Sequence, residues 1–304
     1  MKVVLALDGS EPSLVARDLV VGLPWPAGAT VHLLAAYQVL ADWTGGIGPT
    51  VDWVGDAEEA MRDQLQDELR TLSEPLIEHG LKVERHVVHG RAATAIIDFA
   101  TEIGADLVVT GSRGRGQLHS MLLGSVAAEV ASDAPCPVLV ARGSSVSRLL
   151  VATDGSGSAN AIPEPLEALE IFRGSRADAV AVSIPDGPAF ELMVGLYTLG
   201  DERLASKRHE LREQYQADAD AMAERLTAIG IPTTSHLRAG NPAREILAAA
   251  EEHGTDLIVT GSRGLSGLER MVLGSVARNV LIHARCSVLI VRTGVPADPG
   301  RIEH

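Results

Sequence analysis

Two glycine-rich segments carry the residues best suited to bind an anion. Glycine lets the backbone adopt positive φ angles and come close to a ligand. Successive free amides, together with the N-terminus of a following helix, attract phosphate oxygens. Both segments have the spacing G-x2-G-x9-G-S: Gly111, Gly114, Gly124 and Ser125, and then Gly261, Gly264, Gly274 and Ser275. The spacing predicts a phosphate site in each half, with the serine capping the helix or donating to a phosphate.

An aspartate follows the first apolar run of each half. Asp8 and Asp154 begin the turn Asp-Gly-Ser, and such a carboxylate either contacts a ligand or holds an Asx turn or helix N-cap. This first turn has no G-x-G-x-x-G, and neither glycine-rich segment contains G-x4-G-K-[ST]. These absences argue against dehydrogenases and P-loop ATPases.

The chain contains an internal repeat. Residues 106–127 (DLVVTGSRGRGQLHSMLLGSVA) and 256–277 (DLIVTGSRGLSGLERMVLGSVA) share fifteen of 22 positions at an offset of 150. The starts, VVLALDGS and LLVATDGS, match at an offset of 146, so the halves differ in length between these motifs. The ends, CPVLVAR and CSVLIVR, also match. We therefore expect domains at 1–142 and 147–292, a linker at 143–146 and a tail at 293–304.

Short apolar runs alternate with helical patterns, which predicts a doubly wound α/β fold with a parallel sheet in each half. Strands are expected near 2–7, 30–36, 82–88, 106–110, 137–141, 148–153, 178–184, 233–238, 256–260 and 287–291. Helices are expected near 12–22, 56–79, 91–103 and 125–133, and again between the strands of the second half. The long segments 38–55 and 185–200 are either lids or variable packing loops.

The composition excludes several classes of protein. A net charge of −14 and 3% aromatic residues argue against nucleic-acid binding. No apolar run is long enough to span a membrane, and the start does not resemble a signal peptide. The two cysteines, Cys136 and Cys286, are interpreted as small buried residues, and His119 as solvent-exposed. The expected compartment is the cytoplasm.

At these motifs the chain resembles the universal stress protein family, in its tandem ATP-binding form. The Asp-Gly-Ser turn, the T-G-S-R-G loop, the L-G-S-V-A helix start and the C-P-V-L-V strand carry the resemblance, which covers both halves. It implies a Rossmann-like sheet of order 3-2-1-4-5, which opens a ligand crevice where strands 1 and 4 end.

The resemblance also implies one ATP site per domain, with Mg²⁺ at the phosphates. Asp8 and Asp154 would lie at the adenine–ribose end, with the backbone near Ala36 and Ile184 at the adenine edge. The glycine-rich loops and Ser125 or Ser275 would hold the phosphates, and Arg113 and Arg263 would add positive charge.

The expected function is a nucleotide-dependent switch or sensor in the stress response. The sequence shows no assembled catalytic set, so any ATP hydrolysis is expected to be slow. One alternative is a nucleotide hydrolase or adenylyl-transfer enzyme of the related alpha-hydrolase group, and another is a structural pairing module with empty sites. Exposed last strands, at 138–141 and 288–291, predict an internal pseudo-dimer and allow a further homodimer.

Overall fold

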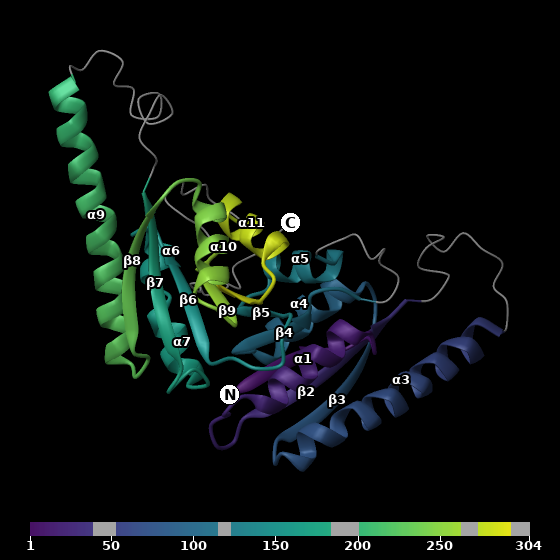
Figure 1. The fold of residues 1–304 in the computed structure, drawn as a ribbon. Coiled ribbons are helices and arrows are strands. Elements are labelled where there is room, and N and C mark those ends of the chain that lie inside the picture. Colours follow the sequence, from purple (N-terminus) through teal and green to yellow (C-terminus); the bar gives the residue numbers. More distant parts are fainter. Residues whose placement is uncertain (39–52, 115–122, 184–200, 263–272, 293–304) are drawn as a thin grey trace, which may run out of the picture.

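A computed structural model describes residues 1–38, 53–114, 123–183, 201–262 and 273–292, and in it ten strands form one continuous sheet. The order across the sheet is β3-β2-β1-β4-β5-β10-β9-β6-β7-β8. Figure 1 shows helices covering both faces of this sheet. The predicted doubly wound α/β class and the order 3-2-1-4-5 in each half are confirmed.

The first half alternates strands and helices as the sequence predicts. Its elements are β1 (Lys2–Ala6), α1 (Glu11–Gly22), β2 (Thr30–Tyr37), α3 (Trp53–Glu78), β3 (Lys82–His89), α4 (Ala92–Ile103), β4 (Leu107–Gly111), α5 (Ser125–Asp133) and β5 (Val138–Ala141). The segment 38–55 lies mostly outside the described residues, and its last three positions belong to α3.

The second half repeats this order with one change. Its elements are β6 (Arg148–Thr153), α6 (Gly157–Asn160), α7 (Pro163–Leu169), β7 (Arg176–Ser183), α9 (Asp201–Ala228), β8 (Thr233–Ala239), α10 (Pro242–Glu252), β9 (Leu257–Gly261), α11 (Ser275–His283) and β10 (Ser287–Val291). Two short helices, α6 and α7, stand where the first half has the single helix α1. Pro163 accounts for the break, because proline is accepted in the first turn of α7 but disfavours a helix that continues through its position.

The two halves join through their last strands. β5 and β10 pair antiparallel, with Leu139 opposite Leu289 at the centre of the register. Each half therefore covers the sheet edge that the other would expose, and the expected internal pairing of the last strands is confirmed.

The antiparallel pair also explains how a short linker suffices. It places the end of β5 at the same side of the sheet as the starts of β10, β9 and β6. Three strand spacings are about 14 Å, which six extended residues can cross. Along the way the Arg142 amide donates to Ser287 Oγ at 3.1 Å, and the Ser147 amide donates to Asp256 Oδ2 at 3.0 Å.

Two apolar cores run the length of the sheet, one on each face. On one face α1, α3, α7 and α9 pack on alternate strand residues such as Leu5, Leu139 and Leu289. On the other face α4, α5, α10 and α11 pack on the intervening strand residues, including Val4, Val140 and Val288. Both cores cross the β5–β10 seam without interruption, so the two halves are packed together as well as hydrogen-bonded.

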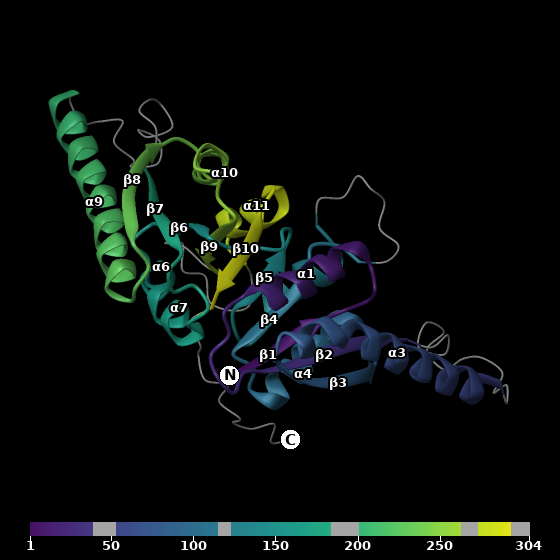
Figure 2. The same ribbon diagram turned by 60° about the horizontal axis from the view of Figure 1, so that its bottom comes forward.

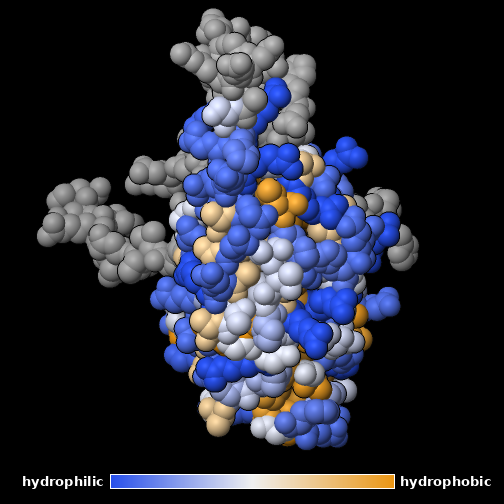
Figure 3. Space-filling model, turned by 60° about the vertical axis from the view of Figure 1, so that its left-hand side comes forward, coloured by the Kyte–Doolittle hydropathy of each residue, from blue (hydrophilic) through white to orange (hydrophobic). Residues whose placement is uncertain are grey.

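The long helices α3 and α9 flank the two ends of the sheet (Figure 2). Figure 3 shows the side that carries α9, where hydrophilic residues predominate. This surface agrees with the acid- and arginine-rich sequence of α9. No helix among the described residues is long and apolar enough to cross a bilayer.

We predict that residues 1–142, expressed alone, form a homodimer through β5. Without β10, this strand leaves buried apolar residues and unpaired backbone groups at an open edge, which favours association with a second copy. Sedimentation velocity should give twice the half-chain mass, while the full chain keeps its mass on dilution. A folded half that stays monomeric at high concentration would show that edge pairing is not a driving force.

Candidate functional site

A cavity of about 260 Å³ opens where β1 and β4 end, on the face covered by α4 and α5. These two strands are hydrogen-bonded neighbours whose crossovers leave in different directions, so a crevice forms between them. Seven residues singled out from the first half line it together: Asp8, Ala36, Gly111, Arg113, Gly114, Gly124 and Ser125.

Asp8 holds the turn after β1. Its Oδ1 accepts hydrogen bonds from the Ser10 amide at 3.0 Å and from Ser10 Oγ at 2.5 Å, which is an Asx turn. Gly9 makes this turn possible with a φ of 72°. The other oxygen, Oδ2, lies against Gly114, since a Cβ built on that glycine would be 2.6 Å from it. Asp8 therefore has a structural role and also lines the cavity.

The sequence suggested that the loop glycines serve both positive φ angles and close approach, and in the first loop the structure shows close approach alone. None of Gly111, Gly114 and Gly124 has a positive φ. A Cβ on Gly111 would lie 2.6 Å from the Pro12 backbone, because β4 ends against the start of α1. A Cβ on Gly124 would lie 3.2 Å from Arg113 Cα. Glycine is needed here because backbone segments and a carboxylate are crowded together.

The N-terminus of α5 faces the cavity without a side-chain cap. Gly124 is the N-cap residue and its amide donates to Ser112 O at 2.8 Å, which closes the base of the loop. The first helical bond runs from Ala128 to Gly124, so the amides of residues 125–127 have no partner within the helix. Ser125 is the first helical residue and is exposed, so the expectation that it caps α5 is wrong.

Ala36 lies on β2 beyond the end of β1. The Leu34 carbonyl accepts from the Leu7 amide at 3.0 Å, on the side of β1. In a strand, the amide and carbonyl groups of every second residue point to the same neighbouring strand. Those of Ala36 therefore point to the same side as those of Leu34, at a level where β1 has already ended. One donor and one acceptor are thus presented at the rim of the cavity.

Thr110 lines the cavity and was not among the predicted site residues, although it begins the T-G-S-R-G loop. Its side chain is 3% exposed, and Oγ1 makes no hydrogen bond within the part of the chain that the structure describes. A buried hydroxyl without a partner costs about 1–3 kcal/mol. The threonine before the first glycine of the loop is a candidate contact for a ligand.

The second half repeats much of this geometry. Asp154 Oδ1 accepts from the Ser156 amide at 3.0 Å, and Gly155 has a φ of 71°. The Gly274 amide donates to Ser262 O at 2.8 Å, and Gly274 is the N-cap residue of α11, which begins at Ser275 and has no side-chain cap. Gly261 ends β9. Ile184, Arg263 and Gly264 lie outside the described residues, as does His119.

Strand register refines the correspondence between the halves. Ala6 pairs with Leu34, and Ala152 pairs with Val180, so the equivalent of Ala36 is Val182. That position is two residues before Ile184. Equivalent residues of the two halves differ in number by 146 as far as β2 and β7. From β3 and β8 onward they differ by 150, as His86 and His236 do. The second half is therefore four residues longer between its second and third strands.

A carboxylate of α9 lies beside the Asp-Gly-Ser turn of the second half. A Cβ on Gly155 would collide with Asp218 Oδ2 of α9, so that carboxylate lies against the Asp-Gly-Ser turn. Burial raises the pKa of the nearby Tyr215 hydroxyl, and the charges of Asp154 and Asp218 act in the same direction.

Both cysteines lie away from the first cavity. Cys136 is buried, and burial raises the pKa of its thiol to about 12. Cys286 is half-buried, and burial also raises its pKa. The expectation of small buried residues is confirmed for Cys136 and holds in part for Cys286.

The fold is a tandem α/β sheet, with a cavity at the carboxyl ends of β1 and β4 in its first half. The model of the universal stress protein family matches residues 1–142 and 146–292. The chain therefore belongs to the universal stress protein family.

Similar proteins agree with this assignment. A universal stress protein of Mycolicibacterium smegmatis is 27% identical over 281 residues, 86% of each chain. One from Methanocaldococcus jannaschii is 33% identical over 141 residues, covering 46% of this chain and 81% of its own. The crystal structure of a universal stress protein from Archaeoglobus fulgidus matches with a TM-score of 0.65 and 23% identity, over 96% of this chain and 98% of that one. This structural likeness supports the fold.

We predict that Thr110→Val stabilises the ligand-free protein by about 1 kcal/mol, because it removes an unpartnered buried hydroxyl at nearly constant shape. Thr260→Val is the matched control, since Thr260 Oγ1 donates to Gly261 O at 3.2 Å and its loss should not stabilise. Denaturant unfolding measures both. Equal effects of the two substitutions would mean that Thr110 is not an unsatisfied group.

Proposed function

We propose that this universal stress protein binds ATP at the carboxyl ends of β1 and β4 in the first half and of β6 and β9 in the second. The observation that carries the proposal is the first cavity. The unpartnered hydroxyl of Thr110, the uncapped N-terminus of α5 and the carboxyl ends of β1 and β4 all border it. In the family such a protein acts as a nucleotide-dependent switch or sensor, and we propose that role here.

The cavity has a separate environment for each part of a nucleotide. Apolar Leu34 and Ile96 line its inner wall, where an adenine ring would pack, with the Ala36 backbone at the edge of the base. Asp8 would accept hydrogen bonds from ribose hydroxyls through its carboxylate. The phosphates would lie against the loop and the α5 amides, where the helix dipole favours negative charge.

Arg113 supports the phosphate end of this arrangement. It lines the cavity between Gly111 and Gly114, and a guanidinium binds phosphate oxygens through two parallel N–H groups. We propose that Mg²⁺ accompanies the nucleotide and is held mainly by its phosphates, as is usual for this ion. The second half offers the same turn and helix start, so we propose a second nucleotide there.

Calorimetric titration of the nucleotide-free protein with ATP and Mg²⁺ tests the proposal. We expect binding at two sites per chain. One site per chain would mean that the second half does not bind, and no binding would reject the proposal. Rapid Mg²⁺-dependent phosphate release would instead favour the hydrolase or adenylyl-transfer alternative.

We predict that Gly114→Ala lowers ATP affinity in the first half by at least about tenfold, or about 1.4 kcal/mol. The added methyl group would meet Asp8 Oδ2 at 2.6 Å, so the carboxylate must move from its place in the cavity. Gly143→Ala is the control, because a Cβ there has no atom within 4 Å. Titration and thermal unfolding of both variants separate binding from folding. Unchanged affinity in Gly114→Ala would exclude this loop as the binding element.

A further inference from the structure

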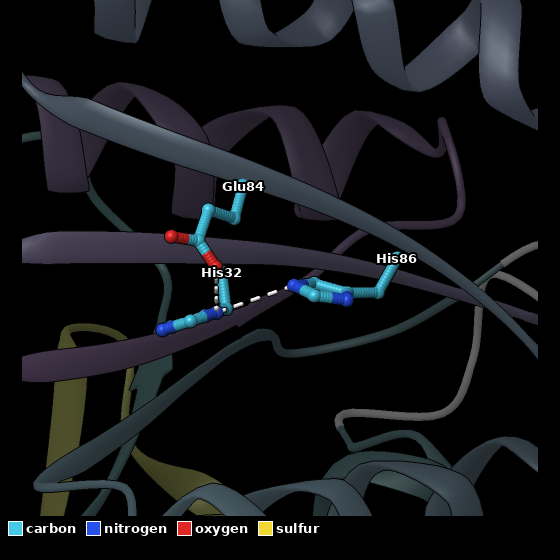
Figure 4. A group of neighbouring side chains, drawn as sticks. All are labelled: His32, Glu84 and His86. Atoms are coloured by element: carbon cyan, nitrogen blue, oxygen red, sulfur yellow. Dashed lines mark hydrogen bonds and ion pairs between the residues drawn. The ribbon is translucent and has the colours of Figure 1, made fainter.

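A second polar group lies in the first half, apart from the cavity described above. His32 of β2 and Glu84 and His86 of β3 point toward one another on the sheet face that α4 covers (Figure 4). The ligand atoms of the three side chains lie within 4.8 Å of one another. We refer to these three residues as the histidine cluster.

The cluster is near the starting ends of the strands, whereas the cavity is at their carboxyl ends. His32 precedes Ala36 by four residues on β2, which corresponds to about 13 Å along a strand. None of the three residues lines the cavity. The inference below is therefore independent of nucleotide binding.

The distances within the histidine cluster suit a tetrahedral metal ion. His32 Nδ1 lies 3.2 Å from His86 Nε2 and 3.5 Å from Glu84 Oε2. Ligand atoms at about 2.0–2.1 Å from a tetrahedral Zn²⁺ are separated by about 3.3 Å. Without a metal, one imidazole must donate a proton to the other. With a metal, both nitrogens and the carboxylate oxygen can keep lone pairs directed at one point.

The surroundings hold the ligands in the required form. His32 is 7% exposed, and the Phe99 ring packs against both imidazoles, with centroids 4.5 Å from His86 and 5.9 Å from His32. Burial lowers the pKa of both histidines, which favours the neutral ring that binds metals. Lys82 Nζ pairs with Glu84 Oε1 at 2.9 Å, so it orients the carboxylate and leaves Oε2 toward His32.

We propose that His32, Glu84 and His86 form a site for a divalent transition metal, with Zn²⁺ as the best match. Two imidazoles and one carboxylate are a known ligand set for zinc. A solvent molecule would take the fourth position, beside the half-exposed Glu84. The bound ion would tie β3, the outermost strand of the sheet, to β2.

The second half contains an internal comparison at the equivalent place. Asp178 and His236 occupy the positions of His32 and His86 by register, and His253 completes the group. There the Asp178 oxygens lie 2.8 Å from His236 Nε2 and 2.9 Å from His253 Nδ1. These separations are those of direct hydrogen bonds and are shorter than a tetrahedral metal needs. The geometry therefore assigns the metal to the first half.

Titration of the full chain with ZnCl₂, after removal of metals by a chelator and without nucleotide, tests the site. We expect one Zn²⁺ per chain and a rise in melting temperature with added zinc, since a ligand that binds the folded state stabilises it. Co²⁺ in place of Zn²⁺ should give the visible absorption of a tetrahedral complex. Absence of zinc binding by the unmodified protein would overturn the proposal.

Single substitutions locate the ion. His86→Ala and Glu84→Gln should each lower Zn²⁺ affinity by at least about tenfold and abolish the tetrahedral Co²⁺ spectrum. Glu84 is half-exposed, so its substitution tests the site even if the histidine variant folds poorly. The control is His209→Ala, which removes a solvent-exposed histidine 3.2 Å from Glu213 on α9 and should change nothing. Unchanged affinity in both cluster variants, or loss in His236→Ala instead, would overturn the assignment.

Discussion

The parallel pairing of the first and fourth strands in each half is the constraint on which the ligand crevice depends. In the first half it sets Val3 opposite Leu107 and Ala6 opposite Thr110, so the Asp-Gly-Ser turn and the glycine-rich loop must leave the sheet side by side. The loop then has little room, because β4 ends against the start of α1 and Gly114 lies against Asp8. Crowding at this point accounts for the glycines there and for the cavity that they border.

The seam between the halves determines the relative direction of their strands. β5 and β10 run antiparallel, so the carboxyl ends of the strands in one half point opposite to those in the other. The Asp-Gly-Ser turns of the two halves therefore lie at opposite edges of one sheet. Both apolar cores continue across the seam, so packed side chains as well as backbone hydrogen bonds join the two halves.

The sequence predicted alternating strands and helices from local patterns, and the resemblance to the family implied the strand order that brings Asp8, Gly111 and Gly124 together. The sequence could not predict the conformation of the loop glycines, which depends on how closely α1 approaches β4. The equivalence of Ala36 with Val182 needed strand register. The histidine cluster was missed because His32 and His86 lie 54 residues apart, and only pairing of the strands brings them together.

The covalent junction between the halves has an evolutionary consequence. In a symmetric dimer every substitution appears twice, so a residue that suits one subunit must suit the other. Here each half is encoded separately, and the pair can be retained while the copies acquire different chemistry. The strand positions held by His32 in one half and Asp178 in the other already differ in this way. One sheet can thus specialise at one end without altering the other.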